Sequence, residues 1–475
     1  MKKNVFLFLS AVAAVFYGCS SDDNGTETAI QTAFVNQSVN LSASDTNVPI
    51  AFSSPTTAAG TITVTLEPTN VVYGTDFTTN PAASGGIISI PFSEGASSVS
   101  LTFTKLIDAI EGQTKNVKFT ISAVSLSNVE IPAATNFTQL NFNETAISQN
   151  TTIAENGGNT IPNQVYVDLS SGSENAVPRT SWELGFYSGS EFRVVLNPAV
   201  NKLAVKQLAT SNIDEVQVAD PAVTTGNYEA SGAGYIDNPY GNLTISATNL
   251  TATAIAEVSA TDADNKVYLV NLGQTVSSTP ATGTSAALTG TDRGWKKIRI
   301  LRSGNDYKLQ YANIDATTHT EVTISKNAAY NHTFFSLVNG AAVSAEPQKD
   351  KWDITLTPFM NYTPYNGQNV SYYFGDVVLT NSLAGTKAYE VFTSAFTYDS
   401  FTAANVVASN FETSAAADRR AIGANWRSTV PLAVKTDRFY VIKDVAGNLY
   451  KLKFTSLLSS ASERGTTTFE YAKLN

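Results

Sequence analysis

The chain carries few side chains of the kinds that usually bind metals or act as nucleophiles. It has one cysteine, Cys19, and two histidines, His319 and His332, in 475 residues. The spacing of the histidines matches no short metal-binding motif. His319 precedes the alternating run TEVTI, whose apolar residues face inward, so we expect it to point to solvent. His332 alternates in step with Tyr330 and Phe334, which predicts a half-buried, structural side chain.

The sequence offers no recognisable catalytic signature. It lacks the GxSxG, HExxH, P-loop and dinucleotide-binding patterns. Glu183 and Asp353 stand in matching positions, each directly after a tryptophan, and two nearby carboxylates can hydrolyse glycosides. We expect each acid to cap a turn or to form a salt bridge instead, so the sequence predicts a protein that is not an enzyme.

Cys19 lies where a bacterial lipoprotein would be cleaved and lipidated. Two lysines precede the apolar run Val5–Phe16, which is too short to span a bilayer as a helix. The following FYGC resembles a lipobox, and the SSDD that continues it resembles the surface-export signal of Bacteroidetes lipoproteins. The resemblance implies a signal peptide over 1–18, a polar tether over 19–30 and a lipid anchor in the outer membrane, exposed at the cell surface. The alternative is an ordinary secretory signal with an incidental cysteine.

The composition favours an exported protein rich in β structure. Hydrophobic residues make up 43% of the chain and aromatic residues 10%, which is enough to build cores, while only 15% are charged. The length of 475 residues predicts two or three domains. The formal net charge of −10 opposes binding to phosphate backbones, so we expect no nucleic-acid partner.

Residues 31–142 are expected to form one immunoglobulin-like β-sandwich. Runs such as Thr61–Leu66, Val99–Phe103 and Val117–Ile121 alternate apolar and polar residues, as half-buried strands do. The order of TITVTL, YGTDF, IPFSEGASS, SVSLTF, IDAIEG and VKFTI resembles the Calx-β family.

In that family, acids at one end of the sandwich can hold calcium. The resemblance implies that Asp76, Asp108 and Glu111 match such positions, although Ala109 stands where a second aspartate is usual. Calcium takes six to eight oxygen ligands. We therefore expect these three acids to be solvated loop residues rather than a calcium site.

The rest of the chain reads as a linker followed by a larger antiparallel β domain. Residues 143–163 are polar and glycine-containing, which predicts a linker. Residues 164–475 show almost no helical periodicity and are rich in strand patterns.

Two stretches of this β domain share one design. In 165–186 and again in 334–356, a strand runs into a glycine-centred turn, a polar segment with one proline follows, and then come tryptophan, an acid and apolar residues. The likeness indicates an internal duplication, with halves over 164–330 and 331–475.

Three motifs carry a family resemblance. YNHTFFSLVNG…DKWDITLTPF, DRFYVIKDVAGNLYKLKFTSL and GTTTFEYAKL resemble the HmuY-like family. Over residues 164–475 the resemblance implies a β-rich, lipid-anchored protein that captures haem or a related ligand for uptake and can hand it to a TonB-type receptor. The alternative, from a different class, is a non-catalytic adhesive or structural surface lipoprotein that binds glycan or protein and no haem.

The haem ligands of the founding type have no counterpart at the matching places. Its two histidines would fall between Val378 and Glu412 and within 424–429, and neither stretch contains a histidine. Met360 is the only methionine beyond Met1, so ligation by two histidines or by two methionines is excluded at the family positions.

Tyrosine remains as a haem ligand. Within the resemblance, Tyr398 is the ligand candidate, and Tyr389 and Trp426 lie in the window expected to line a pocket. His332 is a further haem-binding candidate if the ligand positions have moved. The alternative for Tyr398 is an ordinary, partly buried aromatic residue.

Overall fold

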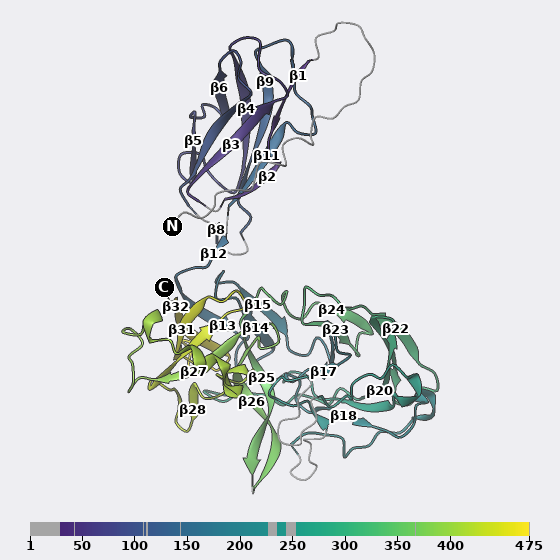
Figure 1. Ribbon diagram of the computed structural model, residues 1–475. Coiled ribbons are helices and arrows are strands. Elements are labelled where there is room, and N and C mark those ends of the chain that lie inside the picture. The colour runs from purple at the N-terminus through teal and green to yellow at the C-terminus, as the bar shows by residue number, and fades with distance from the viewer. Residues whose placement is uncertain are drawn as a thin grey trace. The chain divides into compact units, whose positions relative to one another are not determined.

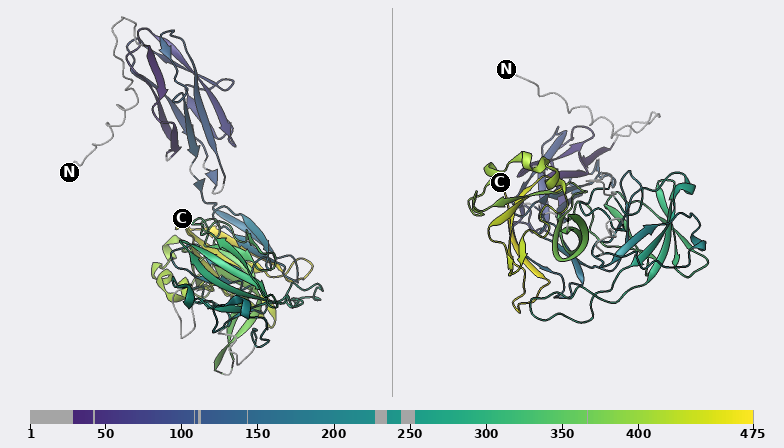
Figure 2. Two further views of the ribbon diagram at one scale, coloured as in Figure 1. Left: turned by 90° about the vertical axis from the view of Figure 1, so that its right-hand side faces the viewer. Right: turned by 90° about the horizontal axis from the view of Figure 1, so that it is seen from below.

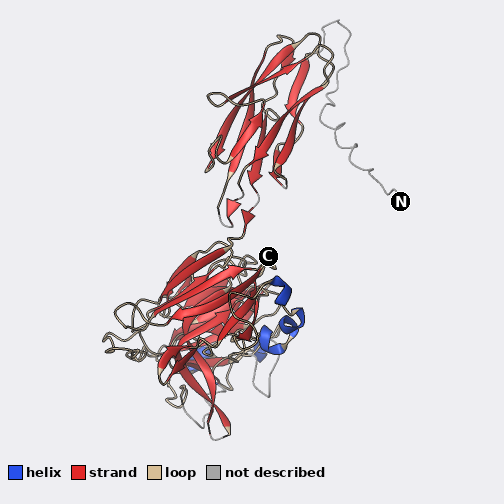
Figure 3. Ribbon diagram, turned by 90° about the vertical axis from the view of Figure 1, so that its left-hand side faces the viewer, coloured by secondary structure: helices blue, strands red, loops and turns tan. Residues whose placement is uncertain are grey.

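The computed structural model describes residues 29–41, 43–107, 109–110, 113–142, 144–226, 235–243, 253–365 and 367–474. The chain divides into two units, Met1–Thr145 and Ala146–Asn475, and most of their regular structure is strand (Figure 1, Figure 3). The prediction of an all-β chain is therefore confirmed. No helix in the described ranges is long and apolar enough to cross a membrane.

The N-terminal unit is a sandwich of two five-stranded sheets. Its strands are β1 Ile30–Phe34, β2 Ser38–Leu41, β3 Asp45–Phe52, β4 Gly60–Thr69, β5 Phe77–Asn80, β6 Ile87–Phe92, β7 Ser98–Lys105, β8 Ala109–Ile110, β9 Asn116–Val124, β10 Val129–Glu130, β11 Phe137–Phe142 and β12 Glu144–Thr145. The sheet orders are β10-β1-β3-β7-β5 and β2-β11-β9-β4-β6, with a short β12-β8 pair. Alternation directs the core, since Ile62 and Val64 of β4 are fully buried and Phe103 of β7 meets Phe119 of β9 with ring centroids 6.1 Å apart. The prediction of a β-sandwich in the N-terminal part of the chain is confirmed.

The C-terminal unit contains four sheets and a small hairpin. Its strands are β13 Gln149–Glu155, β14 Asn163–Val167, β15 Glu174–Pro178, β16 Leu184–Tyr187, β17 Val194–Leu196, β18 Leu203–Gln207, β19 Val267–Leu272, β20 Trp295–Ser303, β21 Asp306–Asn313, β22 Thr320–Ile324, β23 His332–Ser336, β24 Ala341–Val343, β25 Ile354–Tyr365, β26 Gln368–Thr380, β27 Lys387–Phe392, β28 Arg427–Thr429, β29 Leu432–Val434, β30 Arg438–Lys443, β31 Leu449–Ser456 and β32 Thr466–Lys473. The sheet orders are β13-β32-β31-β30-β27, β15-β14-β25-β26, β17-β16-β23-β24 and β18-β19-β20-β21-β22, with β28-β29 as the hairpin. The two five-stranded sheets lie at opposite ends of this unit, and the four-stranded sheets lie between them (Figure 1, Figure 2).

The described helices of the C-terminal unit are single turns. They are η2 Ile213–Glu215, η4 Asp262–Asp264, η5 Ala403–Asn405, η6 Ala408–Glu412 and α1 Ser414–Ala417. In α1 the Thr413 side chain accepts a hydrogen bond from the Ala416 N–H, which caps the first turn. These turns connect strands, and η2, η6 and α1 each bury one side chain, namely Ile213, Phe411 and Ala416.

The predicted linker is wrong for residues 149–155, which form β13. This strand pairs antiparallel with β32, from Gln149 beside Ala472 to Glu155 beside Thr466. Ala154 is fully buried in the core of the C-terminal unit. The sequence QNTTIAE resembles a linker because β13 is an edge strand whose outward positions are polar.

The two sequence copies pair crosswise. Hairpin β14-β15 of the first copy adds β25 of the second copy, and hairpin β23-β24 of the second copy adds β16 of the first. The two five-stranded sheets show the same exchange. β22 lies just before the second copy in the chain, yet it pairs with β21 and completes the sheet built from β18 to β21 of the first half. Likewise β13, just before the first copy, completes the sheet that ends in β32. This symmetry supports a duplication whose repeats begin at β13 and β22, earlier than the predicted starts at 164 and 331.

The acid of each copy binds the strand end of the other. A carboxylate oxygen of Glu183 accepts the N–H of Leu337 at 2.6 Å, and one of Asp353 accepts the N–H of Leu169 at 2.9 Å. Both side chains are buried, with 0% of Glu183 and 4% of Asp353 exposed. Glu183 also forms an ion pair with Arg293 at 2.5 Å. The expectation that these acids cap turns or form salt bridges fits this arrangement.

The tryptophan of each copy also packs on an aromatic ring of the other copy. Trp182 of the first copy packs on Phe334 of the second with ring centroids 4.4 Å apart, and Trp352 packs edge-on against Tyr166 at 5.0 Å. All four rings belong to one buried cluster. Each copy therefore contributes to the core of the other.

Glu183→Ala is expected to lower the free energy of unfolding of the C-terminal unit by about 3–5 kcal/mol, since it removes the buried partner of Arg293 and the acceptor for Leu337. Urea unfolding followed by tryptophan fluorescence reports on this unit alone, because all 4 tryptophans lie within it. The control is Glu412→Ala, whose side chain is 70% exposed in its pair with Lys387 and whose loss is expected to cost less than about 1 kcal/mol. Equal urea midpoints for the two variants would contradict the capping role.

Candidate functional site

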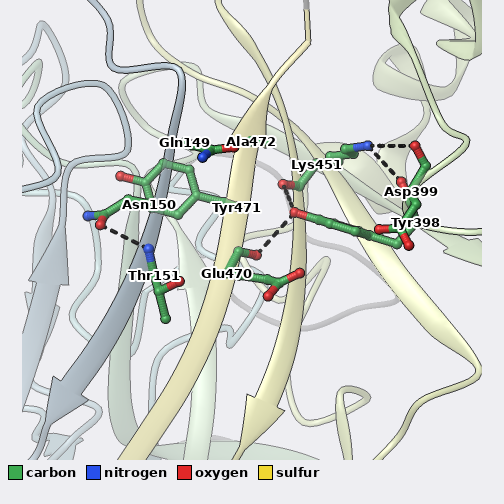
Figure 4. Close-up of a pocket in the computed structure, with 9 residues that line it drawn as sticks. All are labelled: Gln149, Asn150, Thr151, Tyr398, Asp399, Lys451, Glu470, Tyr471 and Ala472. Carbon is green, nitrogen blue, oxygen red and sulfur yellow. Dashed lines mark hydrogen bonds between the residues drawn. The ribbon is translucent and has the colours of Figure 1, made fainter.

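A polar hollow of about 460 Å³ lies on the solvent-facing side of the sheet that contains β13, β32 and β31. Its lining, drawn in Figure 4, consists of Gln149, Asn150, Thr151, Tyr398, Asp399, Lys451, Glu470, Tyr471 and Ala472. Strand alternation produces this surface, because Lys451, Lys453 and Glu470 point outward while Leu452 and Phe469 are fully buried. Tyr398 comes from the segment after β27 and lies across the strands.

Tyr398 is held in place by many contacts. Its hydroxyl donates to the backbone carbonyls of Lys451 at 3.3 Å and Glu470 at 3.5 Å (Figure 4). Its ring packs edge-on against Phe439 at 5.7 Å, and the Nζ atoms of Lys451 and Lys453 lie 4.7 and 4.4 Å from the ring centroid. Such cation–π contacts add to the stability of the ring position.

The electrostatics keep the Tyr398 hydroxyl protonated. Burial raises its pKa well above the usual value, and the nearby Glu470 and Asp399 raise it further. Coordination of iron by tyrosine favours the deprotonated oxygen, which this environment opposes. Tyr398 therefore fits the role of a packing residue better than that of a haem ligand.

The remaining polar groups of the hollow are suited to hydrogen bonding. The Nζ of Lys451 donates to the carbonyls of Tyr398 at 2.7 Å and Phe401 at 3.0 Å, and burial lowers its pKa. Glu470 forms an ion pair with Lys453 at 2.6 Å, with both side chains about one third exposed. Amides, hydroxyls and carboxylates thus face the hollow, and none of its residues forms a nucleophile–base pair in the described contacts.

Tyr389 and Trp426 do not line this hollow. The ring of Tyr389 packs edge-on against Phe411 at 4.9 Å, and its hydroxyl accepts the N–H of Val407 at 3.4 Å. Trp426 is 1% exposed and stacks on Phe454 at 4.4 Å inside the core. The prediction of Trp426 as a pocket residue is wrong, because its side chain is buried in the core of the C-terminal unit.

His332 lies in a different hollow, of about 260 Å³, together with Tyr330 and Glu346. Only 8% of the residue is exposed, so it is more buried than predicted. Its Nδ1 lies 3.9 Å from Glu346 Oε1, and its ring is near that of Tyr187. The other histidine, His319, is partly exposed and its Nδ1 lies 3.0 Å from Asp214.

Iron-ligated haem does not fit the residues expected to hold it. Tyr398 and His332 line separate hollows, Tyr389 is packed under Val407, and Trp426 is in the core. The structure brings only Tyr389 and Tyr398 together, as partly buried members of one hydrophobic cluster.

The predicted calcium and lipid residues lie largely outside the described ranges. Asp108, Glu111 and Cys19 are not among the described residues. Asp76 is described, and its carboxylate accepts the N–H of Val72 at 2.8 Å, as in a loop turn. Within the described part of the chain, no three His, Cys, Asp or Glu side chains gather to hold a metal ion.

One protein-family model matches the second repeat of the C-terminal unit. Residues 328–471 match the family model described as HmuY protein. The HmuY match begins between β22 and β23 and ends within β32, so it covers one repeat rather than the whole of 164–475. The HmuY-like segment includes Tyr398, Lys451 and Glu470.

Several solved structures are similar to parts of the chain. The apo form of the Calx CBD1 domain is 12% identical, with 24% of this chain and 97% of that chain covered and a TM-score of 0.20. The Calx CBD2 domain is 10% identical, with 24% and 86% covered and a TM-score of 0.20. A two-domain protein of unknown function from Bacteroides fragilis NCTC 9343 is 8% identical, with 65% and 90% covered and a TM-score of 0.20. No curated protein matches the chain.

Sequence reasoning missed most of the hollow. The polar composition of 143–163 predicts a linker, so the sequence does not indicate that Gln149, Asn150 and Thr151 lie beside Glu470. The available signal was the alternation of TTTFEYAK in β32, which turns Glu470 outward. Nothing in the sequence alone indicates that Tyr398 crosses to this face.

Tyr398→Phe is expected to leave unchanged the number of tyrosines that ionise by about pH 11, because burial keeps this hydroxyl protonated above the usual tyrosine range. The measurement is the tyrosinate absorbance of both proteins during an alkaline titration. The same substitution should cost only about 0.5–1.5 kcal/mol in stability, since it removes two long hydrogen bonds to carbonyls. Loss of one early-titrating tyrosine in the variant would show that the hydroxyl is free.

Proposed function

We propose that this chain is a non-catalytic, lipid-anchored protein of the cell surface that captures a glycan through its HmuY-like segment. The observation that carries the proposal is the lining of the Tyr398 hollow, which combines the amides of Gln149 and Asn150, the hydroxyl of Thr151, the carboxylates of Asp399 and Glu470 and the ring of Tyr398. Hydroxyl-rich ligands are recognised by such polar groups, which fix orientation, beside a ring that packs on the ligand. The hollow is open to solvent, which supports contact with an exposed chain of sugars over enclosure of a buried cofactor.

The anchoring part of the proposal rests on the sequence around Cys19. A basic start, a short apolar run and a glycine before the cysteine support lipidation at that residue. Lipidation would hold the protein at the outer membrane. The net charge of −10 repels phosphate backbones, so we expect no nucleic-acid partner.

Haem or a related porphyrin is the second candidate ligand, and the HmuY match favours it. Capture for uptake through a TonB-type receptor is the role that this resemblance implies. Because the expected residues do not converge on one site and the Tyr398 hydroxyl stays protonated, this second proposal is capture of the porphyrin ring without an iron bond. Metal-free protoporphyrin should then bind as tightly as haemin.

The test begins with the soluble chain from Ser20 onward on a panel of immobilised neutral glycans. Wild type should retain at least one glycan, and Gln149→Ala and Glu470→Ala should weaken that binding about tenfold each, the effect of losing a hydrogen bond to a ligand. The matched control is Glu155→Ala on the same strand β13, outside the hollow. Equal binding by all three variants would remove the hollow from the proposal.

Haemin and protoporphyrin titrations separate the second candidate. Absence of a saturable Soret shift together with glycan retention supports the glycan proposal. No retained glycan, with a one-to-one shift by haemin and equal affinity for protoporphyrin, would replace it by porphyrin capture. A haemin shift that Tyr398→Phe or His332→Ala abolishes would contradict the packing roles assigned to those residues.

A further inference from the structure

Three charged side chains meet at β26, and none of them lines the Tyr398 hollow. Asp376 Oδ2 forms ion pairs with Nε of Arg427 at 3.1 Å and with an Nη atom of Arg464, so both guanidiniums share one oxygen. β26 is the last strand of its sheet. The register shift opposite Thr357 and Phe359 places a bulge in β26 beside Asp376, and bulges redirect side chains in this way.

The cluster contains two guanidiniums and one carboxylate. Only 4% of the Arg427 side chain, 9% of Asp376 and 15% of Arg464 are exposed. Arginine stays charged in proteins, so the group carries one positive charge in excess in a poorly solvated place. The buried Nε of Arg464 has no hydrogen-bond partner. Burial lowers the pKa of Arg427, Asp376 opposes this shift and Arg464 adds to it.

An exposed aromatic surface adjoins the cluster. Tyr372 is 56% exposed and meets Phe374 edge-on with ring centroids 5.0 Å apart. The two residues are two positions apart on β26, so they lie on one face of the strand. Tyr372 is also close enough to act on the charge of Arg427. A ring packed on Tyr372 would lie beside this cluster, and an anionic group attached to it would approach Arg464, the more exposed of the two arginines.

We propose that Arg427, Arg464 and Tyr372 form a second binding site, for a ligand that carries a carboxylate or sulfate group beside a ring. Charge complementarity supports an anion, because the two arginines have only one carboxylate between them in the described structure. The planar fork of arginine matches carboxylate and sulfate oxygens in pairs. Two classes of ligand share this chemistry, acidic saccharides and aromatic carboxylates, and the ring of either packs on tyrosine.

Three probes test the site on the soluble chain from Ser20 onward by calorimetric titration: trigalacturonate, 2-naphthoate and neutral maltotriose. At least one anionic probe should bind, more weakly as salt is raised, and the anion that binds identifies the class. Arg464→Gln and Tyr372→Ala should each weaken that binding by about tenfold or more. Neither substitution should change the affinity measured for maltotriose.

Arg302→Gln is the matched control, since it removes the same charge from a side chain that is 31% exposed in the other half of the unit. Its affinity should equal that of wild type, and unfolding curves confirm that all variants fold. The site is refuted if neither anion binds, or if Arg464→Gln binds like Arg302→Gln. Neutral glycan binding at the Tyr398 hollow is measured by separate variants, so either proposal can fail while the other stands.

Discussion

Two carboxylates that must be paired after burial hold the C-terminal unit together. Removing an ionised acid from water costs several kcal/mol unless hydrogen bonds replace the lost hydration. Glu183 and Asp353 both meet this requirement with an N–H from the other repeat, at Leu337 and Leu169. Because each acid takes one of its donors from the other repeat, the two repeats stabilise each other. The tryptophan contacts and the sheet-completing strands follow the same crosswise arrangement.

The internal symmetry extends to hydrogen bonds, because an asparagine later in each repeat donates to the carbonyl of the tryptophan of that repeat. Asn197 donates its side-chain N–H to the carbonyl of Trp182 at 2.9 Å, and Asn381 donates in the same way to Trp352 at 3.0 Å. The HmuY match covers the second of these equivalent repeats. Function has to be sought in what differs between the repeats, and both the Tyr398 hollow and the arginine pair at Asp376 take most of their residues from the second one.

The sequence predicted elements better than their partners. Alternation placed Ile62 and Val64 correctly because a two-residue period leaves one possible inward face. It failed for β13, since the outward residues of an edge strand are as polar as those of a linker. Tyr398 was found by its position near a family ligand, but its contacts come from strands more than 50 residues further on. The sequence does not show whether the Trp426 ring is buried or lines a pocket, because the family resemblance gives only the stretch of chain in which pocket residues are expected.

The exchange of β13 and β22 also bears on how such a fold could have arisen. A polypeptide with one repeat would have an uncovered sheet edge and a buried acid that lacks one of its hydrogen-bond donors, and a second molecule could supply both through a two-fold axis. Joining the two repeats in tandem converts that association into an intramolecular one, whose strength no longer depends on protein concentration. The fused pair is then free to lose symmetry on its surface, so that one repeat can acquire binding residues while the other is retained as its structural partner.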